Sequence, residues 1–431
     1  MSGETQDSME TTERRWQAWT YGHFGSVPDM ANVSILSFVH PDVHHKVHEH
    51  WHQFPPPNPF WHPVLGTLYF IIGIVAFAGN GLVMWIFAMT RTLRSGTNFL
   101  MINLALTDLL MMLSQFPVLI ANCFNQTWTL GPLACEIYGF CGALFGTVSI
   151  INMALIAYDR YRAIVTPFAG RRLSKSRALL WIFWAWVYSA TWCSFPFLGW
   201  NRYVLEGFMI SCSFDYLSGD IWSRLYVFAL FLAAYALPLG VIGWCYVLIV
   251  LSVNKHDEDI VNHERSQGEG IKYANLQKRE TQLAKVVFTS VFFWALAWTP
   301  YAVVSLLGLF SWHSLLTPLA TMLPALFAKM STVYNPFIYA VSHPRYRQEV
   351  GRRLPWLCCV IPSPAAQATS SMRSSTKSDI STLPFLSRSA SLVSSRNEKA
   401  QADLPSPTTL MHDMAEKIPS LSAAFDRPMA P

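Results

Sequence analysis

The sequence predicts an all-α membrane protein, a bundle of seven transmembrane helices with an extracellular N-terminus, and three observations support this fold class. Only 13% of the 431 residues are charged and 52% are hydrophobic, whereas soluble domains average about 25% charged residues. Seven apolar segments reach the roughly 20 residues that a membrane-spanning helix needs. Lys and Arg gather in alternate connections between these segments. This composition argues against an ordinary soluble enzyme, and the absence of a basic block interleaved with aromatics argues against a nucleic-acid partner.

The predicted transmembrane domain covers residues 63–342. Its spans are expected at residues 64–90, 99–124, 134–158, 178–200, 223–252, 284–310 and 316–341. Prolines interrupt the last four spans, at Pro196, Pro238, Pro300 and Pro336. A membrane bundle tolerates such prolines because neighbouring helices and water satisfy the freed carbonyl groups.

Basic residues in the short connections predict the orientation. The connections after the first, third and fifth spans are rich in Lys and Arg, whereas residues 125–134 and 311–316 contain neither. Because short cytoplasmic loops carry the excess of Lys and Arg, these three connections are predicted to be cytoplasmic. The N-terminus then lies outside the cell and the C-terminus inside.

Residues 1–62 form a predicted extracellular arm. Asn32-Val33-Ser34 matches the N-glycosylation acceptor pattern on the correct side of the membrane, and Asn125-Gln126-Thr127 matches it close to a helix end. Six histidines lie between His40 and His52 and could bind a metal, but their spacing matches no known site. We therefore interpret this stretch as a solvated polar arm and expect no metal.

The chain changes character after the last span. Residues 343–359 contain a basic amphipathic segment followed by Cys358 and Cys359, which suits a helix on the inner membrane surface with a palmitoylation site. Residues 360–431 are rich in Ser and Thr and too poor in apolar residues to pack. They predict a disordered, phosphorylatable tail, or alternatively an inert solubilising one.

Ionisable residues inside the spans are the first candidates for function, because they are costly to bury there. They are Asp108 in the second span, Lys329 near the middle of the seventh, and Asp159 with Arg160 at the end of the third. Burial disfavours the charged form of a lysine, and its neutral amine is a nucleophile that an aldehyde captures as a Schiff base. A structural pair between Lys329 and Asp108 is the alternative.

Several motifs, each on its expected span, resemble the rhodopsin-like G-protein-coupled receptors. They are Asp159-Arg160-Tyr161 in the third span, Trp298-Thr299-Pro300-Tyr301 in the sixth, Asn335-Pro336-Phe337-Ile338-Tyr339 in the seventh, and Asn80, Asp108 and Pro238 in the first, second and fifth. Lys329 precedes Asn335 by six residues, where opsins carry the lysine that binds retinal. His343-Pro344-Arg345-Tyr346-Arg347, residues 50–59 and residues 199–203 resemble arthropod rhabdomeric opsins. The similarity runs from about residue 40 to 358.

The resemblance implies 11-cis-retinal, or a hydroxylated or dehydro relative, bound covalently to Lys329. A protonated Schiff base is a buried cation that needs a carboxylate nearby. Vertebrate visual opsins place a Glu where this chain has Tyr138, so the resemblance offers Glu206 as the counterion and Tyr138 as a hydrogen-bonding neighbour. The alternative for Glu206 is a solvated loop carboxylate.

The resemblance also implies the surroundings of the chromophore. Gly142 and Gly146 would let a polyene approach the backbone, although close packing against another helix explains Gly142 equally well. Trp298 would rest against the retinal ring, with Tyr301 one turn outward. The family pattern pairs Cys135 with Cys212 in a disulfide, with Cys123 as the competing partner, and this bond would hold the loop that bears Glu206 over the pocket.

On the cytoplasmic side the resemblance pairs Arg160 with Glu280 as an inactive-state ionic lock, with two ordinary flanking charges as the alternative. Breaking the pair would let the sixth span swing outward, and Tyr246 and Tyr339 would stabilise the open form. Asp108, Asn80 and Asn335, with the adjoining Pro336, would form a polar network that links pocket and lock.

The sequence thus predicts a photoreceptor and not an enzyme. Its expected partners are a Gq-type G protein, arrestin, a receptor kinase and membrane lipid, and its expected location is the plasma membrane of photoreceptor microvilli. The third cytoplasmic loop, residues 254–277, departs from arthropod visual opsins because it is more acidic. The alternatives are a non-visual light sensor or a retinal photoisomerase of the same family, a transporter, and a receptor for a diffusible ligand.

Overall fold

The structure is a computed structural model that describes residues 34–90, 95–166, 173–262 and 269–355. Asn32, the two cysteines Cys358 and Cys359, and the Ser/Thr-rich tail lie outside the described residues, so their predicted modifications stay predictions.

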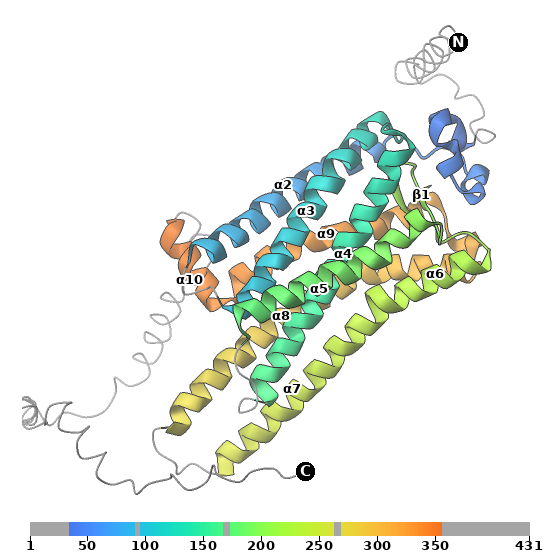
Figure 1. Cartoon of the computed structure of the whole chain (residues 1–431). Coiled ribbons are helices and arrows are strands. Elements are labelled where there is room, and N and C mark those ends of the chain that lie inside the picture. The colour runs from blue at the N-terminus through green and yellow to red at the C-terminus, as the bar shows by residue number, and fades with distance from the viewer. Residues whose placement is uncertain (1–33, 91–94, 167–172, 263–268, 356–431) are drawn as a thin grey trace, which may run out of the picture. The chain divides into compact units, whose positions relative to one another are not determined.

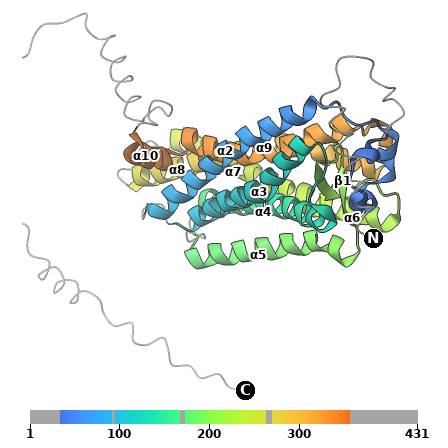
Figure 2. The same cartoon turned by 90° about the horizontal axis from the view of Figure 1, so that it is seen from above.

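Long helices that run side by side make up the described part of the chain (Figures 1 and 2). They are α2 (Trp61–Met89), α3 (Gly96–Asn125), α4 (Gly131–Val165), α5 (Lys175–Ser194), α6 (Ile221–Phe231), α7 (Leu237–Asn262), α8 (Glu269–Leu309) and α9 (Pro318–Ser342). A π-helical turn, Leu232–Ala236, joins α6 and α7 into one span. The seven predicted spans are therefore confirmed as helices, with ends within a few residues of the prediction except for the cytoplasmic ends of α4, α7 and α8 and the extracellular end of α5.

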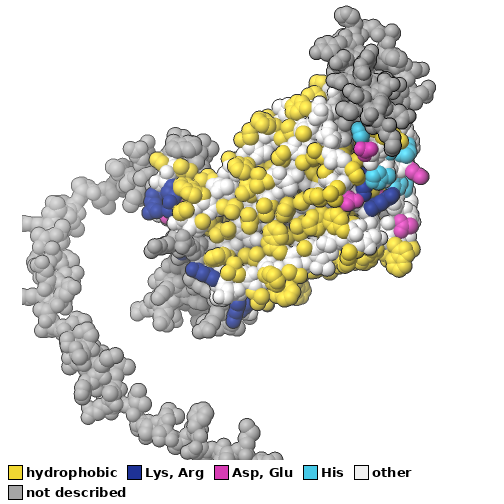
Figure 3. Space-filling view, turned by 45° about the horizontal axis from the view of Figure 1, so that its top comes forward, with side chains coloured by type: hydrophobic (Ala, Val, Ile, Leu, Met, Phe, Trp, Pro, Cys, Tyr) yellow, Lys and Arg dark blue, Asp and Glu magenta, His cyan; other side chains and the backbone are white. Residues whose placement is uncertain are grey.

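Apolar residues cover the outer surface of these helices, which suits contact with lipid. Phe70 is 53% exposed, Phe183 57% and Trp244 67%. One face of the molecule shows a broad band of hydrophobic side chains, with charged groups towards both ends and histidines at one end (Figure 3). Within the described residues, six helices meet the length and hydropathy of a membrane span, and α9, with 25 residues, supplies the seventh helix of the bundle.

Two expectations about the helices are wrong. Pro196 does not kink the fourth span, because α5 ends at Ser194 and Pro196 lies in a short 3-10 helix, Phe195–Leu198. The predicted loop 254–277 is largely helical, since α7 continues to Asn262 and α8 begins at Glu269. Pro300 and Pro336 do lie inside helices, together with Pro117 and Pro324. The π turn ends two residues before Pro238. Because proline has no backbone N–H, it removes one hydrogen-bond donor from the helix at this point.

The extracellular end contains structure that the sequence did not predict. Strands β1 (Tyr203–Glu206) and β2 (Ser211–Phe214) form an antiparallel hairpin between α5 and α6. Before α2, three 3-10 helices fold residues 34–54 into a compact segment, which we call the folded arm: η2 (Ile35–Phe38), η3 (Pro41–Lys46) and η4 (Glu49–Gln53). The folded arm and the hairpin lie at the same end of the bundle (Figure 1).

The interpretation of the histidine-rich arm as solvated and polar holds for the exposed His40, His45 and His52 but is wrong for the segment as a whole. Trp51 is fully buried, and His50 is buried with its Nε2 2.7 Å from the carbonyl oxygen of Leu316. No cluster of His, Cys, Asp or Glu in the described part of the chain could hold a metal ion.

Candidate functional site

Lys329 and Glu206 face a common cavity from two different elements. Lys329 lies in the middle of α9, and Glu206 ends strand β1. The cavity has a volume of about 70 Å³ and is lined by both residues and by Gln115, Gly142, Trp298 and Tyr301. Glu206 is only 4% exposed, so the alternative of a solvated loop carboxylate is wrong. Lys329 is half-buried because its free surface faces this cavity.

Hydroxyl groups surround the carboxylate of Glu206. Tyr216 and Tyr301 each donate a hydrogen bond to its Oε2, at 3.3 and 3.4 Å, and Ser211 donates to its Oε1 at 3.4 Å. Burial raises the pKa of Glu206 above its usual value, and the positive charge of Lys329 is the strongest influence in the opposite direction. The ionisation of this carboxyl group therefore depends on a cation at Lys329.

Tyr138 lies beside Lys329 in an arrangement different from the one expected. The Nζ of Lys329 lies 5.9 Å from the centroid of the Tyr138 ring. The Tyr138 hydroxyl is buried and neither donates nor accepts a hydrogen bond among the described residues. Gln115 fixes the backbone here by donating from Nε2 to the Tyr138 carbonyl at 2.8 Å. Tyr138 thus offers its ring face to the amine and keeps a free buried hydroxyl.

A second cavity adjoins the first and is almost entirely apolar. It has a volume of about 90 Å³ and shares Ala143, Phe214, Trp298 and Tyr301 with the first cavity. The other lining residues include Val227, Leu230, Phe231 and Trp294. Together the two cavities give an elongated apolar volume with one amine and one carboxyl group at one end.

The two glycines of α4 have different neighbours. A methyl group at Gly146 would lie 2.5 Å from the Trp298 indole, so this glycine gives Trp298 its place beside α4. A methyl group at Gly142 would lie 3.2 Å from Oε1 of Gln115, which supports the helix-packing explanation for that residue. Trp298 also donates from Nε1 to Ser331 Oγ at 3.0 Å. Both glycines line a cavity, Gly142 the first and Gly146 the second.

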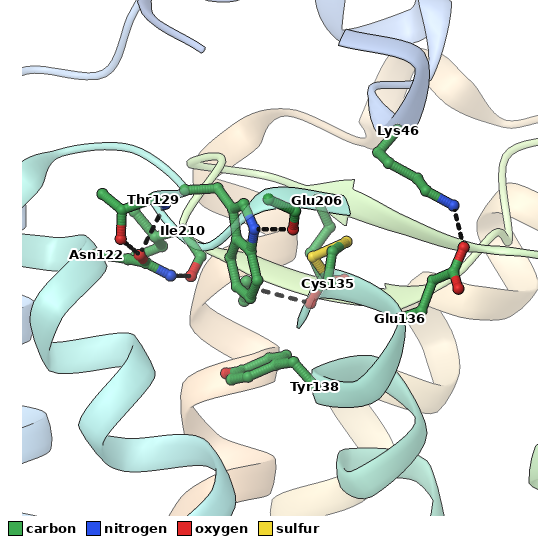
Figure 4. Close-up of a disulfide and its surroundings, with 12 residues drawn as sticks. Lys46, Asn122, Thr129, Cys135, Glu136, Tyr138, Glu206 and Ile210 are labelled. Atoms are coloured by element: carbon green, nitrogen blue, oxygen red, sulfur yellow. Dashed lines mark hydrogen bonds and ion pairs between the residues drawn. A yellow bond between two sulfur atoms is a disulfide. The ribbon is translucent and has the colours of Figure 1, made fainter. Parts of the chain in front are cut away.

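The predicted disulfide between Cys135 and Cys212 is confirmed. It joins the first turn of α4 to strand β2, with the two Cα atoms 5.4 Å apart (Figure 4). In the register of the hairpin Leu205 pairs with Cys212 and Glu206 with Ser211. The bond therefore fixes the strand pair that carries Glu206, while Cys123 stays free and buried.

Arg160 and Glu280 form an ion pair at the other end of the bundle, as predicted. Arg160 is 4% exposed and also pairs with Asp159 at 2.5 Å. Thr97 connects Asp159 and Arg160, since it donates to Asp159 Oδ2 at 2.6 Å and accepts from Arg160 Nη2 at 2.8 Å. The pair thus links α4 to α8, which makes it more than two ordinary flanking charges.

The two tyrosines predicted to stabilise the open form both have partners in this structure. Tyr246 donates to the Ala284 carbonyl at 2.9 Å, and Tyr339 is buried against Phe87 and Tyr346. Tyr161 is only partly buried and packs on Tyr158.

Asp108 belongs to a polar group in the middle of the bundle. Its carboxylate accepts from Asn335 Nδ2 at 2.9 Å and from Ser149 Oγ at 3.4 Å. Asn80 joins less directly, because its Nδ2 donates to the carbonyls of Ala76 and Thr332. No ion pair within 4.0 Å between Asp108 and Lys329 occurs in the described residues, so the structure does not support their pairing.

Comparisons with known proteins decide the family. The profile of the family described as "7 transmembrane receptor (rhodopsin family)" matches residues 79–339. The chain is 41% identical to the lateral eye opsin of Limulus polyphemus, over 77% of this chain and 89% of that protein. It is 42% identical to the rhodopsin of Procambarus clarkii, over 79% and 90%. The crystal structure of squid rhodopsin is similar at 34% identity and a TM-score of 0.72, covering 80% of this chain and 98% of the other.

The chain belongs to the rhodopsin family of seven-transmembrane receptors. Its relatives are invertebrate opsins and rhodopsins, which are light-activated receptors that act through G proteins, and it is a receptor and not an enzyme. The family implies a retinal chromophore. The elongated apolar volume fits such a group, because a lysine amine lies at one end and the buried, unpaired hydroxyl of Tyr138 lies beside it.

Several residues of this opsin's site were missed by sequence reasoning. They are Gln115, Ser211, Ser213, Tyr216 and Thr97. Ser213 contacts the Tyr301 hydroxyl in a short hydrogen bond, and Tyr216 reaches Glu206 from ten residues further along the chain. No local motif marks these positions. A signal was available only in the density of Ser and Tyr residues around Cys212.

Proposed function

We propose that this opsin binds 11-cis-retinal, or a hydroxylated or dehydro relative, through a protonated Schiff base on Lys329 with Glu206 as its counterion. The observation that carries this proposal is the cavity in which Lys329 is the one cation among the lining residues and Glu206 the one carboxylate. When bound, the chromophore supplies a light-driven isomerisation that changes its shape. The chain's own residues place the amine and keep a negative charge opposite it.

The contacts of Glu206 suit a counterion. Three hydroxyl donors stabilise the charged carboxylate, and burial makes the carboxyl group sensitive to a neighbouring cation. Tyr138 would face the bound amine with its ring and supply the free hydroxyl to water or to the chromophore end. Trp298 and Tyr301 would line the middle of the volume, where its two chambers meet.

Signalling to a Gq-type G protein is the second part of the proposal. The buried Arg160–Glu280 pair between α4 and α8 supports a receptor with a closed and an open cytoplasmic face, and a photoisomerase has no need of it. Arrestin binding and phosphorylation by a receptor kinase are proposed for the Ser/Thr-rich tail, and the microvillar plasma membrane is the proposed location.

The visible spectrum tests the first part. Protein expressed with 11-cis-retinal in the dark is expected to show a visible band that shifts on illumination, and Lys329→Ala is expected to lose the band while the receptor still reaches the cell surface. Glu206→Gln is expected to keep retinal but to show the visible band only at lower pH, because the protonated Schiff base loses its counterion. A normal visible band in Lys329→Ala contradicts the proposal. Light-dependent nucleotide exchange on purified Gq tests the second part.

A further inference from the structure

The folded arm repeats one structural unit every four residues. Ile35, Val39, Val43, Val47 and Trp51 are all at most 8% exposed. In the last four of these residues, Val39 to Trp51, the backbone N–H donates to the carbonyl three residues earlier, at 3.0 to 3.1 Å. The N–H of Ile35 donates to the Phe54 carbonyl at 2.9 Å, so the two ends of the segment are joined. The segment is therefore a closed unit with one buried apolar edge.

That buried edge packs into the core of the receptor at the hairpin. The same hydrophobic cluster contains Cys135, Tyr138, Leu205 and Cys212. Val47 also pairs with Leu205 in a parallel backbone bridge. Leu205 is the residue before Glu206, and on its other side it pairs with Cys212. Strand β1, which carries Glu206, thus lies between the folded arm and strand β2, which carries the disulfide residue Cys212.

Side chains attach the arm on both sides of this bridge. Lys46, next to Val47, forms an ion pair with Glu136, which follows the disulfide residue Cys135 in α4 (Figure 4). The Lys46 side chain is 11% exposed and that of Glu136 is 30% exposed, so water screens the pair only in part. His50 connects the arm to Leu316, just before α9. The arm therefore links α4, which carries Tyr138, to the residues that lead into α9, which carries Lys329.

We propose that the folded arm acts as a clasp, that is, a segment that holds strand β1 and its Glu206 in place. Lys46 and Glu136 are then positioning residues for Glu206. The clasp keeps β1 in the register that places Glu206 in the Lys329 cavity, and it limits the access of water and small nucleophiles from the extracellular side. This inference depends on the proposed counterion role of Glu206.

Two spectroscopic measurements on the dark pigment test the clasp: the rate at which hydroxylamine bleaches it, and the pH at which the visible band is half lost on alkalinisation. Lys46→Met and Glu136→Gln are each expected to bleach at least tenfold faster and to lose the band at lower pH. The exchanged pair Lys46→Glu with Glu136→Lys is expected to restore both values. The control is Glu49→Gln, which removes an exposed carboxylate of the same arm.

The direction of the pH change separates the clasp from a simple effect of charge. If the two residues acted only through their charges, removing the lysine would raise the midpoint and removing the glutamate would lower it. The clasp predicts a fall in both variants. Opposite shifts, or bleaching rates within twofold of the unaltered protein, would overturn the proposal.

Hydrogen–deuterium exchange on the protein without retinal keeps the two proposals apart. Residues 203–206 are expected to exchange at least tenfold faster in Lys46→Met than in the unaltered protein or in Glu49→Gln. This result does not require a pigment to form, so it tests the clasp even if the assignment of Lys329 fails. Equal exchange in all three proteins contradicts the clasp.

Discussion

The extracellular and cytoplasmic ends of this bundle join their elements with different kinds of bond. At the extracellular end the Cys135–Cys212 disulfide, the β1–β2 hairpin and the Val47–Leu205 bridge are covalent and backbone connections. At the cytoplasmic end the side chains of Arg160 and Glu280 connect α4 to α8. Backbone and covalent links fix a geometry, whereas a side-chain ion pair can be broken while the helices stay intact.

The cores of the two ends show the same division. One hydrophobic cluster contains the folded arm, the hairpin and Tyr138, and another contains the cytoplasmic parts of the helices with Tyr246 and Tyr339. A signal between the ends therefore has to pass through the middle of the bundle, where Trp298 packs on Trp294 and Asp108 binds Asn335. The difference shows that covalent and backbone links connect the elements of the extracellular end, whereas a side-chain ion pair connects α4 to α8 at the cytoplasmic end. We therefore expect the cytoplasmic end to open more easily.

Breaking the disulfide is expected to have the largest effect on this comparison. Cys135→Ser frees a loop with a sequence separation of 77 residues, and loop entropy predicts a loss of about 4 kcal/mol in the free energy of unfolding. The measurement is thermal denaturation in detergent together with the yield of visible pigment. Cys141→Ala, at a free cysteine, is the control and is expected to change little. Equal stability of the two variants would contradict the assigned role of the bond.

Removing the ion pair is expected to loosen only the cytoplasmic end. Glu280→Gln leaves Arg160 buried with Asp159 as its remaining charged partner and Thr97 as a hydrogen-bond partner, and the loss of one partner from a buried ion pair costs roughly 3 kcal/mol. The expected result is a rise of about 100-fold in the population of the open form, measured as nucleotide exchange on the G protein in the dark.

The spectrum of the same variant sharpens the result. The visible band of Glu280→Gln should remain unchanged, because the extracellular connections are intact. Glu280→Asp, which keeps the charge, should stay closer to the unaltered protein. A shifted band would mean that the two ends are not separate.

Acid is expected to weaken the cytoplasmic end through His343. Burial lowers the pKa of His343 from 6.5 to about 4. Its Nδ1 accepts from the Tyr346 backbone N–H at 3.0 Å and so caps α10 (Pro344–Arg353). Because the folded pKa is lowered, the stabilisation is complete above pH 6.5 and is lost as the pH falls towards 4. At pH 5 the loss is about 2 kcal/mol.

Hydrogen–deuterium exchange of α10 between pH 7.5 and 5 measures this loss, with the exchange rates corrected for the intrinsic effect of pH. His343→Asn keeps an acceptor for the cap but cannot take up a proton in this range, so its α10 should show no such dependence. The same dependence in both proteins would exclude His343 as the cause.

The smallest expected effect belongs to Thr97. Thr97→Val keeps the shape of the side chain and removes its hydrogen bonds to Asp159 and Arg160. Hydrogen bonds to charged groups contribute about 1.5 kcal/mol, so dark nucleotide exchange should rise by about tenfold. Thr97→Ser should restore most of the closed form. An unchanged dark rate in the valine variant would show that Arg160 needs only its carboxylate partners.

The sequence predicted the spans and many of the site residues because each depends on local information. A run of about 20 apolar residues has to be a helix in lipid, and a lysine or aspartate within it stands out, as Lys329 and Asp108 do. The four-residue interval of Ile35, Val39, Val43, Val47 and Trp51 was also present in the sequence. It was missed because it matches neither a strand nor an α-helix, and the neighbouring histidines suggested solvent.

Other features were decided only by the tertiary structure. Whether Glu206 is solvated or buried depends on the register of a hairpin, on a disulfide between residues 77 positions apart in the sequence, and on the folded arm that packs against the hairpin. The hydroxyl groups of Tyr216 and Tyr301 reach Glu206 from different elements. The sequence by itself determined which charged residues lie within the membrane, because a charged residue inside a long apolar run can be recognised without knowing its neighbours in space. Their partners were decided by the fold, because hydrogen bonds and ion pairs act only over a few ångströms.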